Sequence, residues 1–389
     1  MSLASEVIYL DNNATTMVAP EVLEAMLPAF GPDYGNASSM HTFGGRMARQ
    51  ISQGREQVAA LLNADPDEII FTSCGSESDN SAWYSATETQ PEKRHVITTR
   101  VEHSANLAYA RYLESKGYDV TYLGVDAKGQ LDLGELESSL RPDTALVSIM
   151  FANNETGTVF PVEEIARIVK AHGVQLHIDA VQAAGKEIIN LKKLPVDYLA
   201  IAGHKIHAPK GIGVLYLRRG TRFRPFIKGG HQERGRRAGT ENVPYIIGLG
   251  KACELANANL EKERTAVAAL RDRLQCGLLA AIPGCKINGD QEHRLPNTLN
   301  ISFEAVEGEA LLLQLDQYGI CASSGSACTS GSLEPSHVLR AMGVPFTFAH
   351  GSVRFSLSRY NTQAEIDRVI EVMPEIVRSL RTISPFATH

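Results

Sequence analysis

Residues 145–179 read ALVSIMFANNETGTVFPVEEIARIVKAHGVQLHID, and this stretch decides the fold. Its first segment, Ala145–Phe151, is a continuous apolar run that predicts a buried strand, and Leu176–Asp179 predicts a second strand. Between them, Val162–His172 repeats apolar residues every three or four positions, as an amphipathic helix does. A strand–helix–strand unit predicts two parallel strands with the helix packed on one face of their sheet.

The same alternation of short apolar runs and amphipathic segments covers roughly the first 220 residues. Further strands are predicted at residues 68–72, 95–99, 119–123 and 198–202, and further helices at residues 55–62, 79–87 and 105–115. Strands that alternate with helices predict an α/β fold, in which a largely parallel sheet is covered on both faces.

The pattern changes after about Pro244. Residues 246–281 are strongly helical in period and predict a helical connector into a second unit. That unit has predicted strands at residues 297–303 and 352–356 and a closing helix at residues 363–380. We therefore predict a large domain formed by residues 15–258 and a smaller α+β domain formed by residues 1–14 and 259–389.

The composition excludes several classes of protein. A hydrophobic content of 43% and a charged content of 21% are those of a soluble globular protein. The net charge of -6 argues against nucleic acid or an anionic membrane as the main partner. No apolar stretch reaches the about 20 residues of a membrane span, and the first residues lack a signal-peptide pattern. The 6 cysteines show no metal-ligand spacing, so we expect reduced thiols, a cytoplasmic protein and no resident metal.

A lysine, Lys205, follows the predicted strand at residues 198–202. Burial at a strand end lowers the pKa of an ammonium group and suits the amine to Schiff-base chemistry. Asp179 ends another predicted strand, and a carboxylate there could keep a pyridine nitrogen protonated, while Gln182 could donate to a phenolic oxygen. Each residue also has an ordinary explanation, because strand-end lysines usually reach solvent and strand-end aspartates often cap helices.

Residues 72–78, TSCGSES, connect a predicted strand to a predicted helix. Small residues there expose backbone N–H groups and hydroxyls at a helix N-terminus, which predicts a site for a single phosphate. The spacing matches neither the P-loop nor the G-x-G-x-x-G fingerprint, so a nucleoside triphosphate or NAD is disfavoured. An ordinary N-cap is the alternative interpretation.

Two further polar residues, His103 and Asn154, also come after predicted strands. An imidazole there could stack on a pyridine ring and move protons. The alternatives are a structural histidine and an ordinary turn. Open α/β sheets bind ligands at the carboxyl ends of their strands, so the coincidence of these candidates predicts one common site at that edge.

The sequence resembles the cysteine desulfurases of the NifS/IscS type, in fold-type I of the pyridoxal-phosphate (PLP) enzymes. The resemblance covers essentially the whole chain, and its most specific pieces are SSGSACTSG at residues 323–331 and GHQERGRRAGTEN at residues 230–242. The latter piece, with Cys74 and SLEPSH at residues 332–337, is closer to the nitrogen-fixation NifS branch than to the housekeeping IscS branch. The family implies a homodimer whose large domain contains a mostly parallel seven-stranded sheet.

The resemblance also implies roles around the cofactor ring. Lys205 would attach PLP, Asp179 would face the pyridine nitrogen, and Gln182 would face the phenolic oxygen. His103 would lie over the ring and Asn154 beside it.

The remaining implied contacts concern the phosphate and the substrate. The cofactor would also be held by Gly75, Ser76, Ala202, Gly203, His204 and, from the other subunit, Thr240. Housekeeping relatives carry a serine where this chain has Ala202, so only its backbone is expected to contribute. The substrate would be bound by Arg354, Asn154 and Asn13.

Cys328 lies among Gly, Ser, Ala and Thr residues, a composition typical of an exposed, flexible segment. The resemblance implies that L-cysteine is converted to L-alanine and that its sulfur becomes a persulfide on Cys328. An iron–sulfur scaffold or another acceptor would receive the sulfur, with Cys328 transiently ligating a cluster, and the branch points to nitrogenase maturation.

Other functions stay open from the sequence. A housekeeping desulfurase for general iron–sulfur assembly and thio-modification, or a selenocysteine lyase, would use the same residues. An aminotransferase of this fold would not need a reactive cysteine, and a non-catalytic docking protein would not need Lys205, Asp179, Gln182 and Cys328 together.

Overall fold

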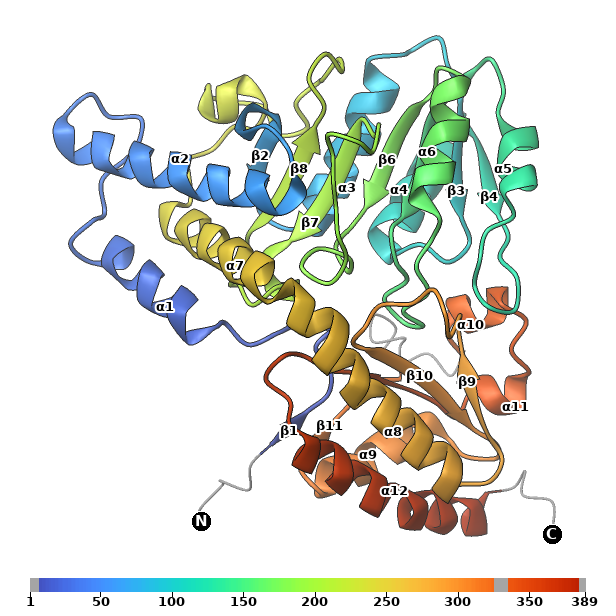
Figure 1. Ribbon diagram of the computed structural model, residues 1–389. Coiled ribbons are helices and arrows are strands. Elements are labelled where there is room, and N and C mark those ends of the chain that lie inside the picture. The colour runs from blue at the N-terminus through green and yellow to red at the C-terminus, as the bar shows by residue number, and fades with distance from the viewer. Residues whose placement is uncertain (1–6, 325–334, 385–389) are drawn as a thin grey trace.

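Seven strands form a central sheet in the order β2-β8-β7-β6-β5-β3-β4 (Figure 1). This computed structural model describes residues 7–324 and 335–384. The strands are β2 Ile69–Thr72, β3 His95–Thr99, β4 Asp119–Leu123, β5 Thr144–Met150, β6 Gln175–Asp179, β7 Tyr198–Ala202 and β8 Gly213–Leu217. All neighbours are parallel except where β8 pairs antiparallel with β2 and with β7. The predicted α/β fold with a mostly parallel seven-stranded sheet is confirmed.

Helices cover both faces of this sheet. Side chains of α2 (Thr42–Leu62), α5 (Leu133–Ser139), α6 (Val162–Ala171) and α7 (Val243–Lys262) share one hydrophobic core with one face of the strands. Side chains of α3 (Gly75–Glu88) and α4 (Ser104–Ser115) share a second core with the opposite face. Because both faces are buried, β2, β3, β5, β7 and β8 are buried along their whole length.

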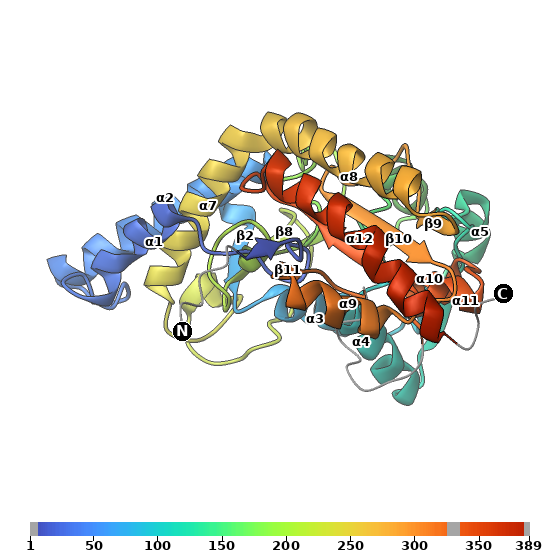
Figure 2. The same cartoon turned by 90° about the horizontal axis from the view of Figure 1, so that it is seen from below.

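The C-terminal part of the chain builds a smaller unit with its own core. Strands β9 (Cys285–Asn288), β10 (Thr298–Phe303) and β12 (Ser352–Ser356) form an antiparallel sheet, and β1 (Ile8–Tyr9) pairs with β11 (Ile320–Cys321). Helices α8 (Ala268–Ala281), α9 (Gly308–Gln317) and α12 (Gln363–Ile383) pack around these strands (Figure 2). Ile8 and Leu10 join this core. The predicted boundaries of the small domain, residues 1–14 and 259–389, stay a prediction.

A helical segment joins the two units. Helix α7 passes through the π-helical turn Glu263–Val267 directly into α8. The helical periodicity of residues 246–281 therefore corresponds to a helical connector, which crosses from the large unit to the small one (Figure 1).

Two helices begin earlier than the sequence predicts. The helix predicted at residues 79–87 starts at Gly75, and the helix predicted at residues 55–62 is only the last part of α2. The added segments are residues 75–78 of α3 and residues 42–54 of α2. They are rich in Gly, Ser and other polar residues, so the sequence predicts a helix there only weakly. Packing decides instead, since a Cβ on Gly54 would lie 2.9 Å from the Ile246 carbonyl oxygen, so α2 and α7 are in close contact.

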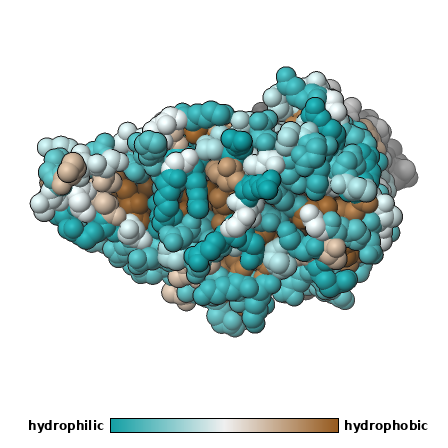
Figure 3. Space-filling model, turned by 90° about the horizontal axis from the view of Figure 1, so that it is seen from above, coloured by the Kyte–Doolittle hydropathy of each residue, from teal (hydrophilic) through white to brown (hydrophobic). Residues whose placement is uncertain are grey.

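The remaining helices are short. They are α1 (Pro20–Met26), α10 (His337–Ala341) and α11 (Phe346–Ala349). Seen from above, the surface of the large unit is mostly hydrophilic (Figure 3). Within the described residues, none of the helices has the length and apolar character needed to cross a membrane.

Candidate active site

The candidate residues meet at the edge where the parallel strands end. Strand β6 ends at Asp179, β7 leads into the 3-10 turn Gly203–Lys205, and β2 leads into α3 at Gly75. His103 is the N-cap of α4 after β3, and Asn154 follows β5. The structure therefore brings the residues predicted to surround a cofactor ring to a single edge of the sheet.

Backbone carbonyls, not a carboxylate, hold the amine of Lys205. Its Nζ donates to the carbonyl oxygens of Asn13 and Ala14, the latter at 2.9 Å. Burial, and next the charge of Arg354, lower the pKa of Lys205 to about 7. About half of the amine is then neutral at pH 7, which is the form that acts as nucleophile or base.

Two hydrogen bonds hold the carboxylate of Asp179 in place. Its Oδ1 accepts a hydrogen bond from the Val181 N–H at 3.0 Å, and its Oδ2 accepts one from Asn106 at 3.4 Å. Asn106 is fixed in turn by the Trp83 indole N–H, which donates to its side-chain oxygen at 2.9 Å. Burial raises the pKa of Asp179, while His103 and Lys205 oppose that shift. A cationic partner facing this carboxylate would therefore be strongly favoured.

Gln182 and Asn13 connect this edge to the N-terminal segment. Gln182 is buried and donates from Nε2 to the Asn13 carbonyl at 3.0 Å, while its Oε1 has no hydrogen-bond partner among the described residues. The side chain of Asn13 donates to the Asn154 carbonyl at 3.1 Å and to the Thr298 hydroxyl at 2.8 Å, and accepts from Asn297 at 3.0 Å. The Asn13 amide is therefore engaged in joining the two units, and its predicted contact with substrate stays a prediction.

His103 is neutral at this edge. Its Nδ1 accepts a hydrogen bond from the Ala105 N–H at 3.2 Å, so the proton of the neutral ring lies on Nε2. Burial lowers the pKa of His103, although the nearby carboxylate of Asp179 raises it. The ring can thus present an N–H donor to whatever occupies the edge.

Helix α3 approaches the site closely because it begins with glycine. A Cβ on Gly75 would lie 2.9 Å from Val181 Cγ2 and 3.4 Å from the Ala202 methyl group. Ser76 is exposed in the first turn, where backbone N–H groups lack partners within the helix. This helix N-terminus is suited to binding an anion.

The histidine before Lys205 lies at the same edge. The His204 ring pairs with the Thr15 hydroxyl at 3.2 Å, and burial lowers its pKa to about 4. A neutral imidazole there can donate one hydrogen bond to a phosphate. Gly203 is buried, and a Cβ on it would lie 2.7 Å from Ile212 Cγ2, so the turn requires a residue without a side chain.

Arg354 reaches the site from the small unit. It is 2% exposed, its Nη2 contacts Asp11 Oδ1 at 2.7 Å, and its Nη1 donates to the Asn154 carbonyl at 3.0 Å. Its buried Nε has no hydrogen-bond partner within residues 7–324 and 335–384. Arg354 is thus positioned next to Asn154 by long-range contacts and retains one donor for an anionic group.

Two predicted site residues are not placed with the others. Thr240 is exposed and lines a cavity of about 230 Å³ together with Ser73 and Gly211. A residue that contributes to the phosphate site of a second subunit must lie at the surface, as Thr240 does. Cys328 lies outside the described residues.

Sequence reasoning missed two partners that position the site. Asp11, which holds Arg354, lies within the family-like segment YLDNNATT at residues 9–16, but nothing in that segment indicates its distant partner. Asn106 lies three residues after His103, on the same side of α4, so helical spacing was a usable signal for it.

Comparisons with known proteins identify the family of the chain. The family model of the class-V aminotransferases matches residues 8–369. A cysteine desulfurase from Trichormus azollae is 65% identical over 380 residues, which cover 98% of this chain and 95% of the relative. The chain belongs to the cysteine desulfurase family.

Other members of this family are also similar to the chain. The cysteine desulfurase NifS of Azotobacter vinelandii is 59% identical and covers 97% of this chain and 94% of its own length. A solved NifS-like protein superimposes with a TM-score of 0.91 at 43% identity, over 96% of this chain and all of that one. A solved structure described as SspA in complex with cysteine has a TM-score of 0.82 at 36% identity, over 91% of this chain and 100% of that one. The predicted family, fold and enzyme class are confirmed.

Proposed function

We propose that this protein is a PLP enzyme that removes sulfur from L-cysteine, releases L-alanine and collects the sulfur as a persulfide on Cys328. The observation that carries the proposal is that Lys205, whose pKa is lowered to about 7, and the buried Asp179 lie at the same edge of the sheet. A relative of similar fold is described as a complex with cysteine, which supports the substrate class.

The residues present fit PLP at this edge. Gly75 leaves room for α3 to direct its N-terminus at a phosphate, with Ser76, His204 and the backbone of Ala202 and Gly203 nearby. Asp179 would face the ring nitrogen, and Gln182 would donate to the phenolic oxygen through the second hydrogen of its amide. His103 would lie against the ring face and Asn154 beside it. The buried Gln182 Oε1, which has no partner in the part of the chain that the structure describes, supports a polar occupant.

When bound, PLP supplies an electron sink for the bond that breaks at the substrate α-carbon. The neutral Lys205 amine would accept the proton from that carbon. The guanidinium of Arg354 would bind the substrate carboxylate through Nε, while Asp11 and the Asn154 carbonyl hold it in position. His103 would carry a proton at Nε2. Burial of these groups excludes water, which strengthens each electrostatic contact.

The transfer of sulfur would follow at Cys328. Its thiolate attacks the substrate sulfur, the carbon–sulfur bond breaks, and a proton on the substrate carbon completes L-alanine. The enzyme keeps the transferred sulfur as a persulfide until an acceptor takes it. An iron–sulfur scaffold is the acceptor we propose, with nitrogenase maturation as the pathway and the cytoplasm as the location, because the NifS of Azotobacter vinelandii is 59% identical.

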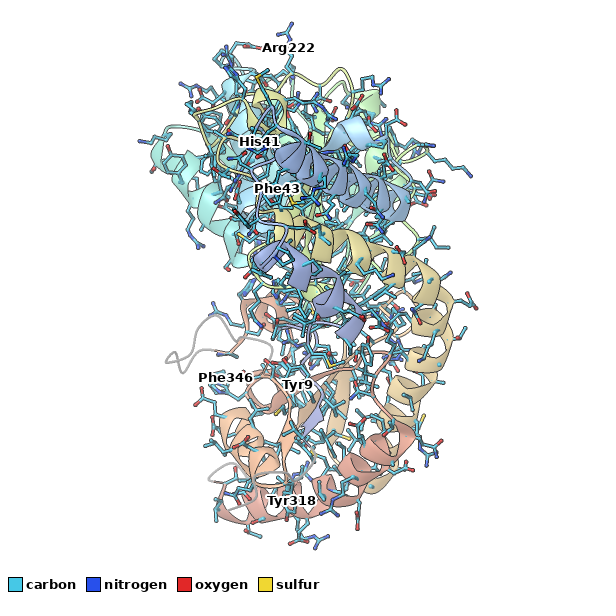
Figure 4. The ribbon with its side chains drawn as sticks, turned by 90° about the vertical axis from the view of Figure 1, so that its left-hand side faces the viewer. Tyr9, His41, Phe43, Arg222, Tyr318 and Phe346 are labelled. Atoms are coloured by element: carbon cyan, nitrogen blue, oxygen red, sulfur yellow. The ribbon has the colours of Figure 1, made fainter. Side chains whose placement is uncertain are left out.

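We also propose that the protein is a homodimer in which Thr240 completes the phosphate site of the other subunit. Large apolar side chains are exposed along the N-terminal segment, at Met17, Leu23, Leu27, Phe30, Tyr34 and Met40. His41 and Phe43, at the start of α2, lie on the same side of the molecule, which faces the viewer in Figure 4. An exposed apolar surface of this kind supports association with a second copy.

The proposal is tested with purified protein, PLP and L-cysteine. We expect a yellow cofactor complex, formation of L-alanine, and a persulfide found by mass spectrometry on the peptide that carries Cys328. The Cys328→Ser variant should bind PLP equally well and form no persulfide. Equal sulfide release by that variant, or failure of the parent protein to bind PLP, would contradict the proposal.

A further inference from the structure

A second buried lysine, Lys186, lies four residues after Gln182 in the turn that follows β6. It is 6% exposed, and its Nζ donates to the Gln182 carbonyl at 3.1 Å. Burial lowers the pKa of Lys186 to about 8, and the Glu263 carboxylate opposes that shift. The proposed chemistry does not use this residue, yet a buried ammonium group costs free energy unless something compensates for it.

Lys186, Glu263 and Arg359 form a charged cluster whose members come from three separate parts of the chain. Glu263 is 4% exposed and is the first residue of the π-helical turn that joins α7 to α8. Arg359 follows β12 in the small unit, and its Nη1 lies 3.6 Å from Glu263 Oε1. A π-helical turn within a helix often marks a functional position. Here it places a carboxylate between a cation of the large unit and a cation of the small unit.

This cluster shares a cavity with Lys205. Lys186, Lys205, Glu263 and Arg359 all line a cavity of about 10 Å³. Such a space holds about one water molecule and no substrate. The cavity therefore has no room for a further ligand, which leaves charge and the Gln182 turn as the routes by which the cluster can affect Lys205.

We propose that Lys186 is a positioning residue that favours the neutral form of the Lys205 amine and holds the turn that carries Gln182. When two amines face the same buried cavity, the positive charge of each one disfavours the charged form of the other. Lys186 retains its proton because Glu263 faces it, so Lys205 is the one that gives up its proton. The inference rests on the proposed function only for the role of Lys205.

All charged groups around the two lysines bear on this balance. Lys205 is faced by Arg354 and Lys186, which disfavour its ammonium form, by Asp11 and Asp179, which favour it, and by the neutral His103 and His204. Lys186 is faced by Glu263, Arg359, His204 and His207. Of the cations facing Lys205, only Lys186 belongs to the same turn as Gln182.

The test titrates the Lys205 amine in the full-length protein before PLP is added. The rate of labelling by trinitrobenzenesulfonate is measured from about pH 5 to about pH 10, and the Lys205 peptide is quantified by mass spectrometry. For Lys186→Met we expect the midpoint to rise by roughly half a pH unit or more, because one repelling charge is lost. Lys186→Arg keeps the charge and should leave the midpoint within ~0.2 units.

A double variant separates charge from general loosening of the site. Lys186→Met with Glu263→Gln also removes the carboxylate, so its midpoint should lie between those of the parent and the single variant. Lys186→Gln serves if the methionine variant does not fold, as judged by circular dichroism, and should show the same rise. An unchanged midpoint in the uncharged variants, an equal rise in Lys186→Arg, or a larger rise in the double variant would overturn the proposal. Because labelling needs neither PLP nor L-cysteine, these results stand apart from whether the protein is a desulfurase.

Discussion

The turn that carries Lys205 and the strand that carries Arg354 bring two cations into one site by different means. Lys205 comes directly after β7, and its amine contacts only backbone carbonyls among the bonds that the described residues show. Arg354 comes from β12 and is paired with Asp11, 343 residues away in the sequence. The comparison teaches that a buried amine held only by backbone carbonyls has a pKa near neutrality, whereas a buried guanidinium held by a carboxylate is fixed in an orientation that can bind anions.

Removal of the unpaired cation should have the largest effect. Lys205→Ala is expected to lower kcat by about 10³-fold or more, because both covalent attachment and proton transfer depend on this amine. The measurement is alanine formation from L-cysteine with saturating PLP. As a control, Lys210→Ala removes an exposed lysine five residues later and should leave the rate unchanged. A comparable loss of rate in that variant would show that the effect of Lys205→Ala is not specific to Lys205.

Removal of Lys205 should raise the free energy of unfolding, although it lowers the catalytic rate. Because the folded state lowers the pKa of Lys205 to about 7, the unfolded chain binds the proton more tightly, and this lysine destabilises the fold most at and below pH 7. Lys205→Met, free of PLP, should therefore be more stable than the parent by a few kcal/mol near pH 7. The gain should shrink to nothing as the pH rises towards about 10.5, which urea unfolding at several pH values would reveal. A gain that does not change with pH would contradict the shifted pKa.

Arg354 should affect substrate binding more than the chemical step. Arg354→Lys keeps a positive charge but loses the planar fork, so we expect kcat/KM to fall by about 10- to 100-fold, mainly through KM. PLP absorbance should be unchanged, because the residue contacts the substrate and not the cofactor. A fall in kcat with an unchanged KM would place Arg354 in the chemistry instead.

The smallest effect is expected for the partner of Arg354. Asp11→Asn retains one acceptor for the guanidinium and removes its charge, so kcat/KM should fall by only about three- to tenfold. Asp11→Asn combined with Arg354→Lys should be less severe than the product of the two single effects, since the residues act as a pair. Fully multiplicative effects would show that Asp11 does not act through Arg354.

Much of the large unit could be predicted because its signals are local. Apolar runs such as Ala145–Phe151 lie close to the observed strands, and polar residues just after them mark the site. The start of α3 at Gly75 could not be predicted, because Gly and Ser carry weak helical signals and close packing against Val181 sets it. The Asp11–Arg354 pair and the Lys186–Glu263–Arg359 cluster could not be predicted either, because their members are distant in the sequence.

The sequence by itself determined the order of strands and helices, the family, and the set of residues at the strand ends, since each depends on residues close together in the chain. Only the tertiary structure decided how those residues titrate. The lowered pKa of Lys205 comes from burial and from charges supplied by Arg354 and Lys186, and that balance exists only once the two units are packed together.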